Sequence, residues 1–186
     1  MRVLAISGSL RSGSYNTGLV RAALELAPPG VEIEPFRGLE LIPPYDQDVD
    51  APGTEPPESV RRLREQIEAA DALFFATPEY NGSVPGVLKN AIDWASARHR
   101  GSSFTNKTVG ITGASTGAFG AIWAQRDLRR ILGIAGARVI KGEVAVAQAQ
   151  NAFSEDGHLQ DRIVARRLRE HLAALVREAA PVPVAA

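Results

Sequence analysis

Apolar residues along the chain fall into two kinds of segment that follow one another. Continuous apolar runs occupy residues 2–7, 71–77 and 107–112, and runs of this length are typical of buried parallel strands. Apolar residues at helical spacing predict helices at 17–27, at 58–70, after Gly86, between Ile122 and Ala135, and from about Leu159. The chain therefore alternates strands with helices.

Two further strands have features of their own. Residues 31–36 alternate polar and apolar positions and contain Pro35, which cannot donate to a central ladder, so we expect this strand at a sheet edge. Residues 138–146 form the last strand, which we expect to break near Gly142. The pattern predicts an α/β fold, a doubly wound five-stranded parallel sheet of order 2-1-3-4-5 with helices on both faces.

This strand order places three loops of unusual composition together. The first, third and fourth strands are neighbours in it, and the loops that follow them begin at Gly8, Pro78 and Gly113. Ligands of doubly wound sheets bind in the crevice outside the carboxyl ends of the strands, at the switch point of the strand order. The three loops are therefore the predicted ligand site.

The first loop is rich in hydrogen-bond donors and leads into a helix. Free backbone N–H groups and the helix dipole favour an anion at a helix N-terminus. Side chains that can donate gather at the same place, and they are Ser9, Arg11, Ser14, Asn16 and Thr17. The loop therefore predicts a phosphate site.

Two better-known phosphate loops do not match. Gly8 and Gly13 have the spacing of a P-loop, but Ser14 stands where its lysine belongs. The dinucleotide fingerprint would need glycine at Leu10. What remains is a pocket for one terminal phosphate, as on a mononucleotide. A purely structural alternative is that Ser14 and Asn16 only cap the helix and the glycines only turn the chain.

The second and third loops offer room for a planar polar ring. Tyr80 provides an aromatic ring, Asn81 an amide, and Gly82 allows close backbone approach. Ser115 and Thr116 lie among glycines in the third loop. A phosphate site beside a place for a polar heterocycle describes flavin mononucleotide (FMN). Taken singly, the second loop is also compatible with a turn before a proline-started helix, and the third with an ordinary glycine-rich turn.

Composition narrows the functional classes. The 186 residues suit one domain, which we place at 1–180 with a frayed tail at 181–186. Lys+Arg and Asp+Glu number 21 each, which argues against nucleic-acid or membrane partners. The chain has no cysteine and three scattered histidines, so we expect no disulfide, no thiolate catalysis and no metal site. A soluble, cytoplasmic protein is the expectation.

The motifs of the three loops together resemble those of a known family. Gly8-Ser9-x-Arg11-x-x-Ser14-x-Asn16, followed by Pro78-Glu79-Tyr80-Asn81-Gly82 and Gly113-x-x-x-Gly117-x-x-Gly120, resembles the NADPH-dependent FMN reductase family of flavodoxin-like quinone, azo-dye and chromate reductases. The resemblance covers roughly residues 2–175, with a departure at Ala121, where many relatives have glycine. It implies a site around the FMN phosphate made by Ser9, Arg11, Ser14, Tyr15, Asn16 and Thr17. It further implies that the flavin and its ribityl chain are bordered by Pro78, Glu79, Tyr80, Asn81 and Gly82 on one side, and by Ser115, Thr116 and Gly117 on the other.

The resemblance implies a reductase that uses NADPH or NADH as co-substrate and passes two electrons through FMN to a quinone or a similar small acceptor. A flavin reductase that releases FMN and a flavodoxin-like electron carrier are alternatives, and a non-enzymatic nucleotide-binding regulator is a third. No catalytic residue can be named. The stretch 98–100, Arg-His-Arg, is either a solvated helix end or a contact for the extra phosphate of NADPH.

The resemblance also implies a homodimer or homotetramer formed through the helices around the flavin, with Glu79 near a subunit contact. Trp94 and Trp123 occupy positions that the apolar stripes of their helices do not require. Exposed tryptophans beside a ligand crevice favour a subunit interface. We therefore expect both side chains to be exposed.

Overall fold

A computed structural model describes residues 1–97, 99 and 101–180, and its centre is a parallel sheet. The strand order is β2-β1-β3-β4-β5, as the sequence predicted, and β6 also pairs with β4. The strands are β1 (Arg2–Ser7), β2 (Glu32–Pro35), β3 (Ala72–Thr77), β4 (Thr108–Ala114), β5 (Arg138–Val139) and β6 (Val144–Val146). The flavodoxin-like topology is confirmed.

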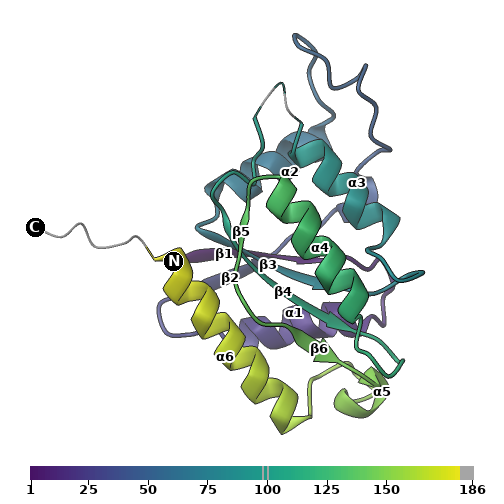
Figure 1. Ribbon diagram of the computed structural model, residues 1–186, viewed down its shortest axis with the longest axis vertical. Helices are drawn as coiled ribbons and strands as arrows, with labels where there is room; N and C mark the ends of the chain where they lie inside the picture. Colours follow the sequence, from purple (N-terminus) through teal and green to yellow (C-terminus); the bar gives the residue numbers. More distant parts are fainter. Residues whose placement is uncertain (98, 100, 181–186) are drawn as a thin grey trace, which may run out of the picture.

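Helices cover both faces of the sheet (Figure 1). They are α1 (Tyr15–Glu25), α2 (Glu58–Ala69), α3 (Gly86–Ala95), α4 (Ile122–Ile134), α5 (Ala149–Ala152) and α6 (Arg162–Ala179), with a 3-10 turn at Leu39–Leu41. Successive residues of a strand point to opposite faces, so Val3 and Ala5 pack with α1 and α6, while Leu4 and Ile6 pack with α2, α3 and α4. None of the described helices is long and apolar enough to cross a membrane.

The last strand is divided, as predicted. β5 and β6 both pair in parallel with β4, and Gly142 between them has a φ of 88°. This left-handed conformation suits glycine and interrupts the strand.

Two of the differences between predicted and observed boundaries have a visible structural cause. β4 extends through Ala114, so Gly113 belongs to the strand, and a Cβ there would lie 2.8 Å from the carbonyl oxygen of Thr77. The last helix begins at Arg162, because Asp161 accepts hydrogen bonds from the N–H groups of the first turn. The short helix α5 was not predicted. The predicted tail 181–186 lies outside the described residues, as do Arg98 and Arg100 of the basic stretch.

Trp94 is fully buried, so its predicted exposure was wrong. Its indole Nε1 donates to the carbonyl oxygen of Pro43 at 2.8 Å, and its own carbonyl accepts from Nε of Arg64 at 3.0 Å. Arg64 also pairs with the buried carboxylate of Asp50. The tryptophan thus anchors the long connection between β2 and α2 to α3, although most of that connection is exposed.

Candidate functional site

The loops after β1, β3 and β4 meet in one hollow of about 120 Å³, which is smaller than the ~300–1,000 Å³ usual for small-molecule sites. It is lined by Ser9, Arg11, Ser14, Tyr15, Asn16, Pro78, Glu79, Tyr80, Ala114, Ser115 and Thr116. Ala114 is the lining residue that the sequence did not predict. The structure places Thr17, Asn81, Gly82 and Gly117 outside the lining.

The first loop presents donors to the hollow. Ser14 is the N-cap of α1, and its Oγ accepts from the backbone N–H of Asn16 at 3.2 Å. The N–H groups of Ser12, Gly13 and Tyr15 have no acceptor among the residues that the structure describes, and of these three residues Tyr15 lines the hollow. These free donors lie at the positive end of α1, where an anion is stabilised.

The charges around the hollow also suit an anion. The guanidinium of Arg11 forms no ion pair with any described carboxylate. Glu79 is the lining carboxylate, and its Oε2 already accepts from the N–H groups of Trp123 and Ala124, both at 3.0 Å. A set of free donors with one guanidinium fits the dianionic phosphate of FMN.

Asn16 and Thr17 have structural partners. The amide of Asn16 donates to the carbonyl of Ala114 at 3.0 Å and accepts from its N–H at 2.9 Å. The hydroxyl of Thr17 pairs with that of Ser7 at 3.0 Å. The capping oxygen of Ser14 and the amide of Asn16 therefore have the structural roles that the alternative interpretation of the first loop gave them. Both residues line the hollow.

The second loop is a tight hairpin. Tyr80 and Ser83 exchange two backbone hydrogen bonds of 3.1 Å, and the two residues between them, Asn81 and Gly82, have φ values of 53° and 75°. An Asn-Gly pair at two positive-φ positions is the sequence signature of a two-residue hairpin turn. This explains why neither residue lines the hollow, whereas Tyr80 does.

The second loop is also fixed to α4. The Glu79 carboxylate caps the N-terminus of α4, and Ser83 donates to Asp127 on the same helix. This hydrogen bond, followed by one from Arg130, holds the pKa of Asp127 below its ordinary value. Glu79 thus holds the loop in place within one chain, a role that the sequence did not indicate.

The third loop is shaped by close backbone approach. A Cβ on Gly120 would lie 2.6 Å from the backbone nitrogen of Val146, and Ala121 has a φ of 59°. The side chain of Gln125, 1% exposed, donates to the carbonyl of Gly120 at 3.0 Å and supports this turn. Sequence reasoning missed Gln125, although a polar residue beside the buried Ala124 and Leu128 was a signal.

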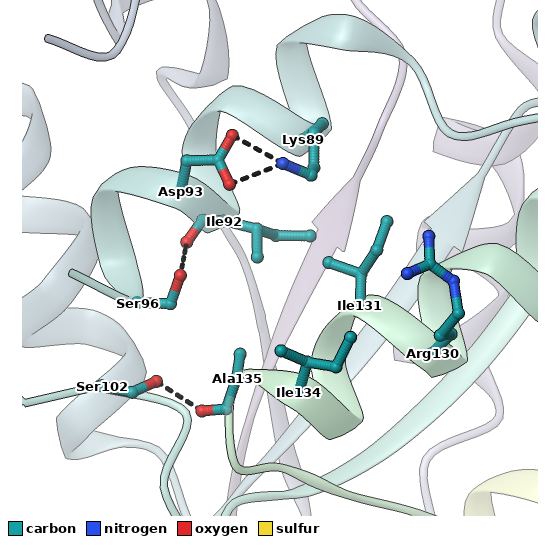
Figure 2. A pocket seen from close by; sticks show the side chains of 9 residues that line it. All are labelled: Lys89, Ile92, Asp93, Ser96, Ser102, Arg130, Ile131, Ile134 and Ala135. Atoms are coloured by element: carbon teal, nitrogen blue, oxygen red, sulfur yellow. Dashed lines mark hydrogen bonds and ion pairs between the residues drawn. The ribbon is translucent and has the colours of Figure 1, made fainter. Parts of the chain in front are cut away.

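A larger groove lies away from the three loops, between α3 and α4. Figure 2 shows Ile92, Ile131 and Ile134 facing it, with the ion pair of Lys89 and Asp93 at one side. Its lining holds none of the predicted site residues. We therefore treat it as a surface separate from the hollow.

The fold and the three-loop hollow define a flavodoxin-like protein with a mononucleotide site. The model of the NADPH-dependent FMN reductase family matches residues 1–151, and the chain belongs to that family. Its members use NAD(P)H and FMN, so the chain is an oxidoreductase with FMN as cofactor.

Relatives agree with this assignment. The chain is 49% identical to an NAD(P)H-dependent FMN reductase of Pseudomonas aeruginosa, over 94% of this chain and 93% of the relative. It is 38% identical to an NADPH:quinone oxidoreductase of Arabidopsis thaliana, over 94% and 90% of the two chains. Among solved structures, the flavoenzyme NAD(P)H:(acceptor) oxidoreductase FerB of Paracoccus denitrificans matches with a TM-score of 0.82 and 34% identity, over 96% of each chain.

Proposed function

We propose that the three-loop hollow holds FMN, with its phosphate at the first loop, and that the enzyme passes two electrons from NAD(P)H to a quinone. The observation that carries this proposal is that one hollow is lined by Arg11 and Tyr15, whose N–H has no described acceptor, and also by Tyr80, Ser115 and Thr116. Relatives named quinone reductase support the choice of acceptor.

Bound FMN supplies the redox chemistry, because it can accept a hydride from a nicotinamide and pass two electrons onward. The chain's own residues supply binding and orientation. Arg11 and the free N–H groups of the first loop neutralise the phosphate. Glu79 and Ser83 hold the second loop against α4, so the wall beside Tyr80 stays in place. Backbone N–H groups of the second and third loops would stabilise negative charge that develops on a bound ring.

One shared site has a kinetic consequence. The hollow cannot hold a nicotinamide and a second planar acceptor on the same face of a flavin at once. We therefore expect oxidised nicotinamide to leave before the quinone enters. Double-reciprocal plots with NADPH varied at several fixed quinone concentrations should give parallel lines. Intersecting lines, together with isotope exchange that requires a ternary complex, would contradict the single site.

The same assay separates the alternatives. An electron carrier would show no saturable oxidation of NADPH. A reductase that releases its flavin would show a rate that depends on added FMN, with FMN behaving as a substrate. A rate that depends on the quinone at saturating FMN supports the proposed enzyme.

We further propose that the chain forms a homodimer or homotetramer through the groove between α3 and α4. Ile134 at its edge is 75% exposed and lies beside Ile131 and Ile92 (Figure 2). A charge at this position should oppose association, so Ile134→Glu should reduce the mass measured by light scattering. Ile163→Glu is the matched control, because Ile163 is 63% exposed on α6. A wild-type monomer with full activity would contradict the proposal.

The expected cytoplasmic location stays a prediction.

A further inference from the structure

Three aromatic side chains are exposed in the second loop, the third loop and the start of α4, and the first of them, Tyr80, lines the hollow. Phe119 in the third loop is 61% exposed, Trp123 at the start of α4 is 45% exposed, and Tyr80 in the second loop is 50% exposed. Large aromatic side chains usually bury their area, since each removes about 150–250 Å² of surface from water. Rings left in water beside a ligand site are a surface available to a ligand.

Phe119 and Trp123 form a fixed pair. Their ring centroids are 4.8 Å apart with an interplanar angle of 63°, the edge-to-face arrangement that aromatic rings prefer. The backbone N–H of Trp123 donates to Glu79, and Glu79 lines the hollow. The backbone of Trp123 is therefore bonded to a residue of the hollow, although neither Phe119 nor Trp123 is part of its lining. We call Phe119 and Trp123 the aromatic shelf.

We propose that the aromatic shelf binds the ring of the quinone acceptor and so determines which acceptors the enzyme prefers. A planar, electron-poor quinone can stack on an electron-rich indole, and the stretch from Ser115 to Ala121 has no charged side chain. This composition favours a neutral planar acceptor over an inorganic anion. The inference rests on the proposed quinone reductase function.

The first test compares two acceptors in the FMN-loaded enzyme. A naphthoquinone should need the shelf, whereas ferricyanide has no ring to stack. Trp123→Ala should lower the ratio of kcat/KM for the naphthoquinone to kcat/KM for ferricyanide by about fivefold or more, the scale of one stacking contact. Trp123→Phe keeps a ring and should restore most of the ratio. An unchanged ratio in Trp123→Ala would overturn the proposal.

The second test does not depend on turnover. The chain has two tryptophans, and Trp94 is fully buried, so an added quinone should quench mainly Trp123. Titrating the oxidised enzyme with the naphthoquinone, without nicotinamide, should give saturable quenching. Trp123→Phe should lose this saturable component while Trp94 still fluoresces. Quenching that rises without saturation, as by random collision, would contradict a bound quinone.

A second copy of the chain is the rival occupant of the shelf. In that case Trp123→Ala would dissociate the oligomer in light scattering and leave the acceptor ratio unchanged, which overturns the proposal. Failure of the underlying function has a different signature. A wild-type enzyme that oxidises NADPH with ferricyanide but with no quinone would refute the quinone reductase assignment itself.

Discussion

The side chain of Asn16 holds both backbone groups of Ala114, donating to its carbonyl at 3.0 Å and accepting from its N–H at 2.9 Å. Asn16 is 3% exposed and lies in the first turn of α1, whereas Ala114 ends β4. The two residues are 98 positions apart in the chain. This one amide therefore fixes the first loop to the strand that leads into the third loop.

Asn16→Ala should destabilise the apoprotein by about 2 kcal/mol, because it leaves buried backbone groups of Ala114 without partners. Urea unfolding without FMN measures this loss. The matched control is Asn151→Ala, since Asn151 is exposed. An equal, small effect of the two substitutions would contradict the role given to Asn16.

Arg11→Ala should weaken FMN binding about tenfold or more, because a hydrogen bond to a charged group contributes ~1.5–3 kcal/mol. Titration of the apoprotein with FMN and with riboflavin measures it. Riboflavin has no phosphate, so its affinity should change little.

Arg37→Ala is the control for that titration, since Arg37 is an exposed arginine outside the three-loop hollow. It should leave both affinities unchanged. Equal weakening of FMN and riboflavin by Arg11→Ala would show that Arg11 does not contact the phosphate.

Ala121→Gly should stabilise the apoprotein by about 1 kcal/mol, because Ala121 has a φ of 59° and glycine adopts this conformation without steric cost. Thermal or urea unfolding tests it. Ala173→Gly, at an exposed position inside α6, should do the opposite and destabilise by about 1 kcal/mol. Destabilisation by both substitutions would contradict strain at Ala121.

The free energy of unfolding should decrease at low pH, because His171 is harder to protonate in the folded protein than in the unfolded chain. The pKa of His171 is lowered from 6.5 to about 4, chiefly by burial and then by the charge of Arg129, while a hydrogen bond to the Ile111 backbone opposes them. Nε2 has no described hydrogen-bond partner. The unfolded chain takes up this proton at higher pH than the folded one. The contribution of His171 to the free energy of unfolding is therefore complete above pH 6.5. As the pH falls to 4, this contribution should reduce the free energy of unfolding by about 3 kcal/mol.

The test compares unfolding free energies between pH 7 and pH 4 in the wild type and in His171→Gln. The variant should lose most of the pH slope over that window. A His171→Gln variant with an unchanged slope would assign the pH dependence to other groups.

The sequence predicted the sheet well because its signals are local. Continuous apolar runs mark β1, β3 and β4, and Pro35 marks the edge strand. The crevice followed from strand order alone, and most of the predicted residues line it. The sheet and the position of the crevice were therefore predictable, because residue composition and strand order determine them.

What the sequence could not show depends on contacts between distant residues. Trp94 resembled a surface tryptophan, but its indole meets Pro43, which lies in a connection without regular pattern. Nothing local in the sequence reveals the bond of Asn16 to Ala114, and its place beside the phosphate stays a prediction. The hairpin at Asn81 and Gly82 is different, because the Asn-Gly pair is a local signal for such a turn.

The most direct test of the central claim is an anaerobic titration of the FMN-loaded protein, followed by its visible spectrum. The account predicts a yellow protein that loses its colour with about one equivalent of NADPH or NADH, as a two-electron cofactor requires, and regains it when a quinone is added. An apoprotein that fails to bind FMN would contradict the three-loop site. A bound flavin that neither nicotinamide reduces would contradict the enzyme.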